Sequence, residues 1–213
     1  FPYALHEFIR TVIREHKRIL FNGNGYDDAW VREAEKRGLL NLKTTPDCLP
    51  YLVSDKNLKL FTTHAVFSET ELRARLEILT ENYKKVVGIE AMTMLDMARR
   101  EILPAACAYQ HELAETIAAK RASSCPADCA YETETLEASS ALTAAMFRSV
   151  KALEDAISEM RSASETRVQA VCCKEKVLVN MNELRLSADA LETLTGARFW
   201  PYPTYGELLF SVR

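Results

Sequence analysis

Three groups of residues in this chain have types and spacing that could do chemistry. The first is Gly23-x-Gly25, which stands ahead of a predicted helix and could form a phosphate-binding turn. It follows a predicted helix rather than a strand and lacks the lysine of a phosphate loop. Asp27 and Asp28 also stand where the anion would bind. The sequence therefore favours a structural turn.

The second group is the run from His111 to Glu115, HELAE, which resembles a zinc-protease helix with its second histidine replaced by Glu115. His111 and Glu115 share a helix face and could bind a metal weakly, but no third ligand is identifiable. A di-iron bundle needs a Glu three residues before a His on two helices. None of the histidines has one: His6, His16, His64 and His111. We interpret the run as a solvated helix face and predict no metal site.

The third group is Cys125-x-x-x-Cys129 together with Cys172-Cys173, which could form a four-thiolate zinc site. The spacing is a weak signal, and adjacent ligands strain a tetrahedral geometry. A chain of this size needs no disulfide framework. Buried, reduced thiols are therefore favoured, which predicts a reducing compartment, the cytoplasm.

Charged residues offer two further candidates. Glu90 falls on a predicted apolar stripe between Val86 and Met94, where a carboxylate must be paired or reach solvent. An edge position or an ion pair is favoured over a catalytic group, because the sequence shows no polar cleft around it. The basic run of residues 14–18 is interpreted as a solvated helix end, where the helix dipole favours cations.

The aromatic segment FWPYPTY, residues 199–205, is a candidate docking element. Two prolines hold it extended and display large side chains at little entropic cost. Docking onto the chain's own helices is favoured, and docking across a subunit or domain boundary is the alternative. The candidate interface residues are Trp200, Tyr202, Tyr205 and Phe210.

Helices are expected to position all of these residues, since 6 Gly and 7 Pro are few for 213 residues. An amphipathic helix is predicted from Ala4 to Leu20, ending in Asn22–Gly25, where positive φ is tolerated. Asp27 and Asp28 begin a short helix that closes at Gly38 in a left-handed cap. A turn at Thr44–Asp47 and a short helix over residues 56–62 follow.

Long helices are predicted after Ser68, whose hydroxyl and Glu71 form a capping box. An apolar stripe with alternating spacing of four and three follows, namely Leu72, Leu76, Leu79, Tyr83, Val86, Met94, Met97 and Ile102. Pro104 is expected to kink this helix, which resumes through Lys120. The loop SSCP, residues 123–126, precedes helices over residues 129–162 and 165–184. Ser187 is expected to cap a last short helix that Gly196 closes.

The predicted fold is all-α, an antiparallel bundle of three long helices with short helices at its ends, because short connections make long helices antiparallel neighbours. Residues 1–67 form a short-helix segment, residues 68–186 the bundle, and residues 187–213 a short helix and aromatic tail. One compact domain is expected overall.

Net charge and apolar runs exclude two classes of partner. A net charge of −3 gives no electrostatic case for nucleic acid. No apolar run approaches the roughly 20 residues that span a bilayer, so no membrane partner is expected. The chain opens on Phe1-Pro2, and we interpret it as part of a longer protein whose catalytic machinery lies upstream.

Four segments resemble a known enzyme family. They are residues 21–50 (FNGNGYDDAW to TTPDCLP), Glu90–Pro104 (EAMTMLDMARREILP), Asn182–Ala190 (NELRLSADA) and Phe199–Phe210 (FWPYPTYGELLF). Together they resemble the C-terminal region of type III glutamine synthetase, a large bacterial enzyme that joins ammonia to glutamate with ATP. The resemblance covers most of the chain and is weakest over residues 105–167.

The resemblance implies a catalytic barrel upstream, in which glutamates on strands hold Mg or Mn, and arginines and backbone groups bind glutamate and the phosphates of ATP. None of those motifs occurs here, so no catalytic, cofactor-binding or metal residue is transferred to this chain. It also implies stacked hexameric rings, with this helical segment packed on the catalytic domain of the same polypeptide or between subunits. Two alternatives remain open: a free-standing helical interaction or regulatory module, and a metal-dependent enzyme.

Overall fold

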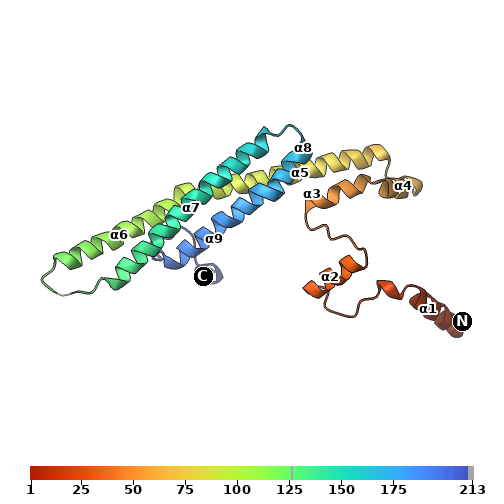
Figure 1. The fold of residues 1–213 in the computed structure, drawn as a ribbon, viewed down its shortest axis with the longest axis horizontal. Helices are drawn as coiled ribbons and strands as arrows, with labels where there is room; N and C mark the ends of the chain where they lie inside the picture. The colour runs from red at the N-terminus through yellow and green to blue at the C-terminus, as the bar shows by residue number, and fades with distance from the viewer. Residues whose placement is uncertain (126, 211–213) are drawn as a thin grey trace. The chain divides into compact units, whose positions relative to one another are not determined.

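The structure, a computed structural model, describes residues 1–125 and 127–210, and these residues form helices joined by short connections (Figure 1). The described residues contain no strand, so the prediction of an all-α chain is confirmed for them. Contacts within the chain divide it into two compact units, Phe1–Lys43 and Thr44–Arg213. The division at residues 67 and 186 remains a prediction.

The first unit contains helices α1 (Pro2–Glu15) and α2 (Asp28–Lys36). The predicted end of the first helix is wrong, since α1 stops at Glu15 and none of residues 22–25 takes a positive φ. A 3₁₀ turn, Lys17–Ile19, follows α1, and the Ile19 N–H donates to the His16 carbonyl oxygen at 2.9 Å. Such i+3 bonds satisfy terminal carbonyls without a left-handed residue.

Helix α2 begins and ends as the sequence predicts. The Asp27 carboxylate accepts from the Ala29 N–H at 2.8 Å and caps the first turn. At the other end Gly38 has φ of 77°, which only glycine adopts at low cost.

Local contacts around Arg37 hold the first unit together. The Arg37 guanidinium donates to the carbonyl oxygens of Arg18 and Leu20 at 2.8 and 2.9 Å. It also lies 5.9 Å from the ring centroids of both Phe21 and Trp30, whose own centroids are 4.4 Å apart. No residue of this unit's helices is buried.

The second unit opens with three short elements, which are α3 (Thr45–Cys48), a 3₁₀ turn (Leu49–Val53) and α4 (Asp55–Thr63). The 3₁₀ turn and α4 pack against α5, which follows them. Lys174, far along the chain, donates to Asp47 at 2.8 Å. This ion pair links α3, at the start of the unit, to the π-helical turn Cys173–Val177.

Helix α5 (Glu69–Met97) begins at the predicted capping box, in which Ser68 and Glu71 bond each other's backbone N–H groups. A π-helical turn, Ala98–Ile102, joins it to α6 (Leu103–Ala122). Pro104 lies in the first turn of α6, directly after the π-helical turn. The π-helical turn widens the helix just before the proline, and helical structure continues as predicted.

Two further long helical segments complete the unit. Helix α7 (Ala130–Ser162) packs against α6 and α9. Helix α8 (Thr166–Cys172) continues through a π-helical turn, Cys173–Val177, into α9 (Leu178–Leu194). In the predicted loop of residues 123–126, Pro126 lies outside the described residues.

The expectation that Ser187 caps a separate short helix is wrong. Helix α9 runs through this position, and the Ser187 hydroxyl donates to the Glu183 carbonyl oxygen within the helix at 3.3 Å. A serine inside a helix can bond the carbonyl four residues back, and the sequence pattern does not distinguish that from a cap.

The core stripe of α5 consists of Leu72, Thr80, Val87, Ala91 and Leu95. The prediction that Leu79 and Val86 belong to it is wrong, because these side chains are 45% and 44% exposed. Thr80 is buried in place of Leu79, and its hydroxyl donates to the Leu76 carbonyl oxygen at 2.7 Å. A polar side chain satisfied in this way can enter a core.

One apolar core joins the long helices of the second unit. Its fully buried members on α7 are Met146, Val150 and Leu153, and α9 adds Leu184 and Leu191. Gln110 reaches from α6 to the hydroxyls of Ser139 and Thr143 on α7, at 3.0 and 2.8 Å.

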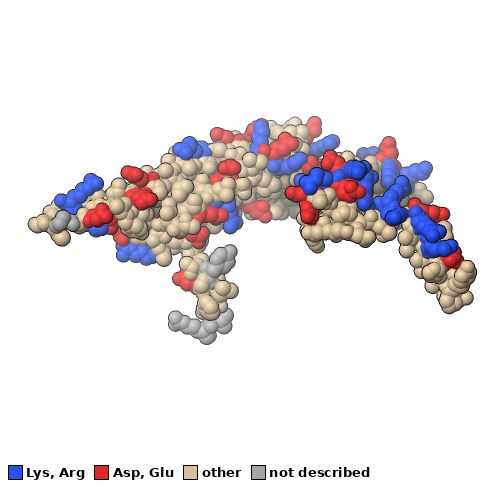
Figure 2. Space-filling view, turned by 60° about the horizontal axis from the view of Figure 1, so that its bottom comes forward, with Lys and Arg blue, Asp and Glu red and all other residues tan. Residues whose placement is uncertain are grey.

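The surface carries both signs of charge, with Lys and Arg interspersed among Asp and Glu on the face drawn in Figure 2. Many of these charges pair one helical turn apart, as Arg73 does with Glu69 at 2.7 Å. Such exposed pairs add little stability.

In the part of the chain that the structure describes, no helix has the length and apolar character needed to cross a bilayer.

Candidate functional site

The turn at Gly23 and Gly25 has a packing role. A Cβ atom at Gly23 would lie 2.5 Å from Cζ of the Phe21 ring, which is closer than any side chain tolerates. The glycine therefore makes room for the ring that stacks on Trp30. This is the structural turn that the sequence favours.

His111 and Glu115 lie on one face of α6 with Nε2 and Oε1 3.3 Å apart, and both side chains are largely exposed. Over residues 1–125 and 127–210, no three His, Cys, Asp or Glu side chains come together in a group that could hold a metal ion. The structure therefore offers this pair no third ligand.

The six cysteines are free thiols and do not gather into the four-thiolate site considered from the sequence. Cys125 is exposed, whereas Cys173 is buried. Burial, together with the neighbouring Cys172, raises the pKa of the Cys173 thiol to about 11. Because the thiolate is the reactive form, Cys173 behaves as an apolar core group.

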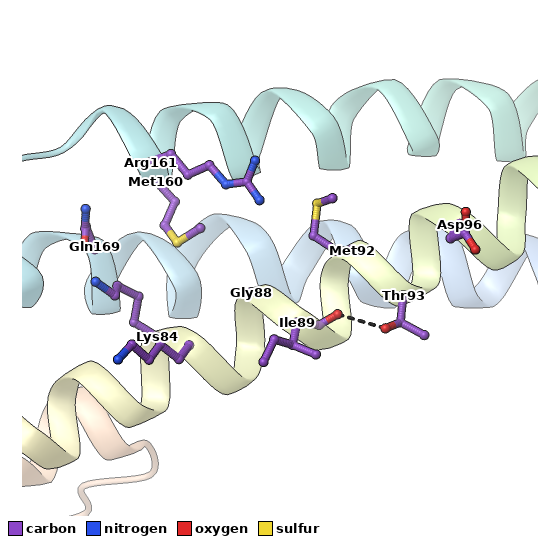
Figure 3. Close-up of a pocket in the computed structure, with 10 residues that line it drawn as sticks. Lys84, Gly88, Ile89, Met92, Thr93, Asp96, Met160, Arg161 and Gln169 are labelled. Atoms are coloured by element: carbon purple, nitrogen blue, oxygen red, sulfur yellow. Dashed lines mark hydrogen bonds between the residues drawn. The ribbon is translucent and has the colours of Figure 1, made fainter.

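A groove of about 600 Å³ runs between α5 and the end of α7 (Figure 3). Its apolar part is formed by Gly88, Ile89 and Met92 of α5 and by Met160 of α7. A Cβ atom at Gly88 would meet nothing nearer than the Met160 methyl at 4.0 Å, so the groove has room for a small side chain at this position. A second hollow of about 400 Å³ continues it along the same two helices.

Cations stand on both sides of this groove, with Lys84 on α5 and Arg161 on α7 (Figure 3). Neither forms an ion pair with another described residue. Further along, Arg99 pairs with Glu154 across the two helices, and its guanidinium holds the pKa of Glu154 below its usual range. The groove therefore favours an acidic or amphipathic group, and it contains no nucleophile paired with a base.

The aromatic tail forms a third hollow, of about 420 Å³, against the core. Trp200 and Tyr202 are half-buried there and pack against the core, with ring centroids 6.3 Å apart. Burial, followed by the nearby Glu101 carboxylate, raises the pKa of Tyr202 to about 12, so this phenol stays protonated.

The other two predicted interface residues lie differently. The Tyr205 side chain is outside the described part of the chain, although its backbone begins α10 (Tyr205–Leu209). Phe210 is 82% exposed. The structure therefore brings Trp200 and Tyr202 together and leaves Phe210 at the surface.

Sequence reasoning missed an apolar surface on α5, formed by Leu79, Val86 and Ile89, which are all exposed. The signal was present in the sequence, because α5 carries two apolar stripes. The predicted stripe combined residues of both. Glu90, which was predicted to lie on that stripe, is exposed to solvent.

The fold and these surfaces define an all-α protein whose described residues hold an apolar core, surface grooves and local ion pairs. Residues 4–121 match the model of the glutamine synthetase C-terminal domain. The chain belongs to this family, which confirms the resemblance to the C-terminal region of type III glutamine synthetase.

Curated relatives match along nearly the whole chain. A glutamine synthetase of Butyrivibrio fibrisolvens is 41% identical over 213 residues, which is 98% of this chain and 30% of the relative. A type-3 glutamine synthetase of Dictyostelium discoideum is 33% identical over 97% of this chain and 29% of its own length. A glutamine synthetase of Bacteroides fragilis is 28% identical over 98% of this chain. The chain thus spans about a third of the length of these relatives.

Proposed function

We propose that this chain is the C-terminal helical domain of a type III glutamine synthetase and that it contributes structure and assembly rather than chemistry. The observation that carries the proposal is the family match, together with relatives that cover nearly all of this chain with less than a third of their own length. The remaining length of such an enzyme has room for the catalytic region, with ATP and Mg or Mn bound there.

The surface chemistry supports the same proposal. Within the described residues many carboxylates form ion pairs or cap helix ends, as Glu69 and Asp27 do, and no group of three potential metal ligands occurs. A glutamate–ammonia ligase must hold divalent metal, phosphates and glutamate together at one site. The described residues build an apolar core and show no such cluster of ligands, which supports a structural role for this chain.

The finer architecture belongs to this proposal. We take the long segments α5–α6, α7 and α8–α9 as an antiparallel bundle, supported by the packing of α7 against both α6 and α9. The partners proposed are the catalytic domain of the same polypeptide and further copies in stacked hexameric rings, in the cytoplasm.

Activity assays of two proteins test the proposal. The 213-residue chain alone, given glutamate, ammonium, ATP and Mg²⁺, is expected to form no glutamine, whereas the longer enzyme that contains it should. Turnover by the chain alone would place a reaction centre within it and overturn the proposal. The longer enzyme without these residues should lose its ring assembly, measured by light scattering. Intact rings would favour the alternative of an independent interaction module.

The aromatic tail offers a sharper variant. Replacing Trp200 by Ala removes a ring that packs against Tyr202 and the core. In the longer enzyme we expect weaker assembly or a looser tail, seen as faster proteolysis after residue 196. Unchanged stability and unchanged oligomeric state would exclude a docking role for Trp200.

A further inference from the structure

Helix α5 has a second row of apolar side chains beside its core stripe, and they stay partly open to solvent although Thr45 and Leu49 lie next to Leu79 and Val86, and Met160 lies next to Met92. The exposed apolar side chains on this helix are Ile78, Leu79, Val86, Ile89 and Met92. Ile89 and Thr93 lie at the open edge of the groove between α5 and α7 (Figure 3), and Ile89 is 67% exposed. Single apolar residues at a surface are ordinary, but several in one row call for an explanation.

The spacing of this outer stripe is that of a coiled coil. Leu79, Val86 and Thr93 recur every seven residues, and Asn82 and Ile89 follow the first two after three. These are the a and d positions of a heptad, which face a partner helix. The Thr93 hydroxyl is satisfied by the Ile89 carbonyl oxygen at 3.0 Å, so it can face an apolar partner.

The charges beside the stripe select a partner. In this register Lys85 takes position g and Glu90 position e, on opposite flanks. In a parallel coiled coil, a g residue meets the e residue five positions later on the other helix. Lys85 of one helix would therefore meet Glu90 of an identical helix. Because the dimer has two-fold symmetry, the pair would occur twice.

Both charges can form that pair. Lys85 forms a solvent-exposed ion pair with Glu81 at 2.8 Å, which adds little stability, so Lys85 can exchange this partner for another. Glu90 is exposed and has no ion pair with another described residue. Charge complementarity thus points to a second copy of this same helix.

We infer that α5 packs in parallel against α5 of a second copy through Leu79, Val86 and Ile89, with Lys85 pairing to Glu90 of the other copy. This contact deepens the assembly role proposed above, because it names one surface through which copies associate. The stripe spans only about two heptads, roughly 20 Å, so the contact is weak by itself and suits one of several in a larger assembly.

A pair of matched variants tests the surface in the full 213-residue chain. Val86 on α5 and Val179 on α9 are both exposed helical valines, at 44% and 53%. Sedimentation over a range of concentrations should show that Val86→Glu raises the dissociation constant of the dimer by about tenfold or more, because two carboxylates would meet at the axis. Val179→Glu should leave it unchanged. Circular dichroism should show equal helix content in all three proteins.

A charge exchange tests the register. Lys85→Glu and Glu90→Lys should each weaken the dimer several-fold, since each puts like charges together. The double variant should recover most of the loss, because it restores two opposite pairs. Losses that add up in the double variant would exclude the parallel pairing.

Two outcomes would overturn the inference whatever happens in the activity assays. One is a chain that remains monomeric at every concentration examined. The other is a dimer that Val86→Glu and Val179→Glu affect equally, which would place the contact elsewhere. Because these measurements use no glutamine formation, a failure of the proposed enzyme role and a failure of the α5 contact remain distinguishable.

Discussion

The short helices of the first unit are more strongly amphipathic than the long helices of the second, yet only the second unit builds a core. In Phe1–Lys43 the apolar side of α1 stays open, with Phe8 66% and Ile9 47% exposed. In the second unit α7 alone buries Met146, Val150 and Leu153 completely. The difference shows that an apolar stripe specifies one side of a helix, whereas burial needs a second apolar surface within reach.

The first unit consequently depends on local contacts. A helix as short as α1, with 14 residues, is marginal on its own in water. The contacts that order this unit are the Asp27 cap, Gly38 and the bonds of Arg37. Its exposed apolar side is consistent with the proposal that further parts of a longer enzyme pack against it.

The largest effect is expected from replacing one leucine by alanine in each unit. Leu153→Ala empties a fully buried site, so the free energy of unfolding should fall by about 2–5 kcal/mol. Leu40→Ala, at a side chain 65% exposed, should change it by less than about 0.5 kcal/mol. Urea unfolding followed by circular dichroism measures both. Equal losses would mean that the first unit has a core after all.

An intermediate effect is expected inside the first unit. Arg37→Ala removes the hydrogen bonds to the carbonyl oxygens of Arg18 and Leu20 and the ion pair with Glu33, together worth about 1–2 kcal/mol of local stability. Amides of α2 should exchange several-fold faster with deuterium, while those of α7 remain unchanged. Arg32→Ala is the control, because Arg32 is exposed on the same helix. If α7 exchanged faster too, the two units would not be independent.

The smallest effect concerns the ion pair that opens the second unit. The Lys174 ammonium, followed by the Thr44 hydroxyl, lowers the pKa of Asp47 from its ordinary 3.8. A lowered folded-state pKa means that the pair stabilises the fold above the ordinary value and stops doing so as pH falls through the folded one.

Asp47→Asn should therefore lower the midpoint of thermal unfolding at neutral pH and lose this difference in acid. Scanning calorimetry from pH 7 down to about pH 2 measures it, since the two midpoints should converge below the ordinary pKa of a carboxyl group. Asp155→Asn, at an exposed position of α7, should show no such convergence. A constant difference at all pH values would exclude this pair as its origin.

Local signals explain why most elements were predictable. The capping box at Ser68, the caps at Asp27 and Gly38, and the break before α7 each act through neighbouring residues. Their physics is confined to a few residues, so the sequence contains all of it. The all-α class follows from the same local signals, whereas the family resemblance rests on similarity of whole sequence segments.

Long-range packing decided what the sequence left open. Helix α5 has two apolar stripes, and only its contacts with α7, α8 and the 3₁₀ turn decide that Thr80 and Val87 turn inward while Leu79 and Val86 face solvent. The pairing of Asp47 with Lys174 likewise joins positions 127 residues apart. Composition fixes how much apolar surface a helix has, but which of it is buried depends on the other helices that reach it.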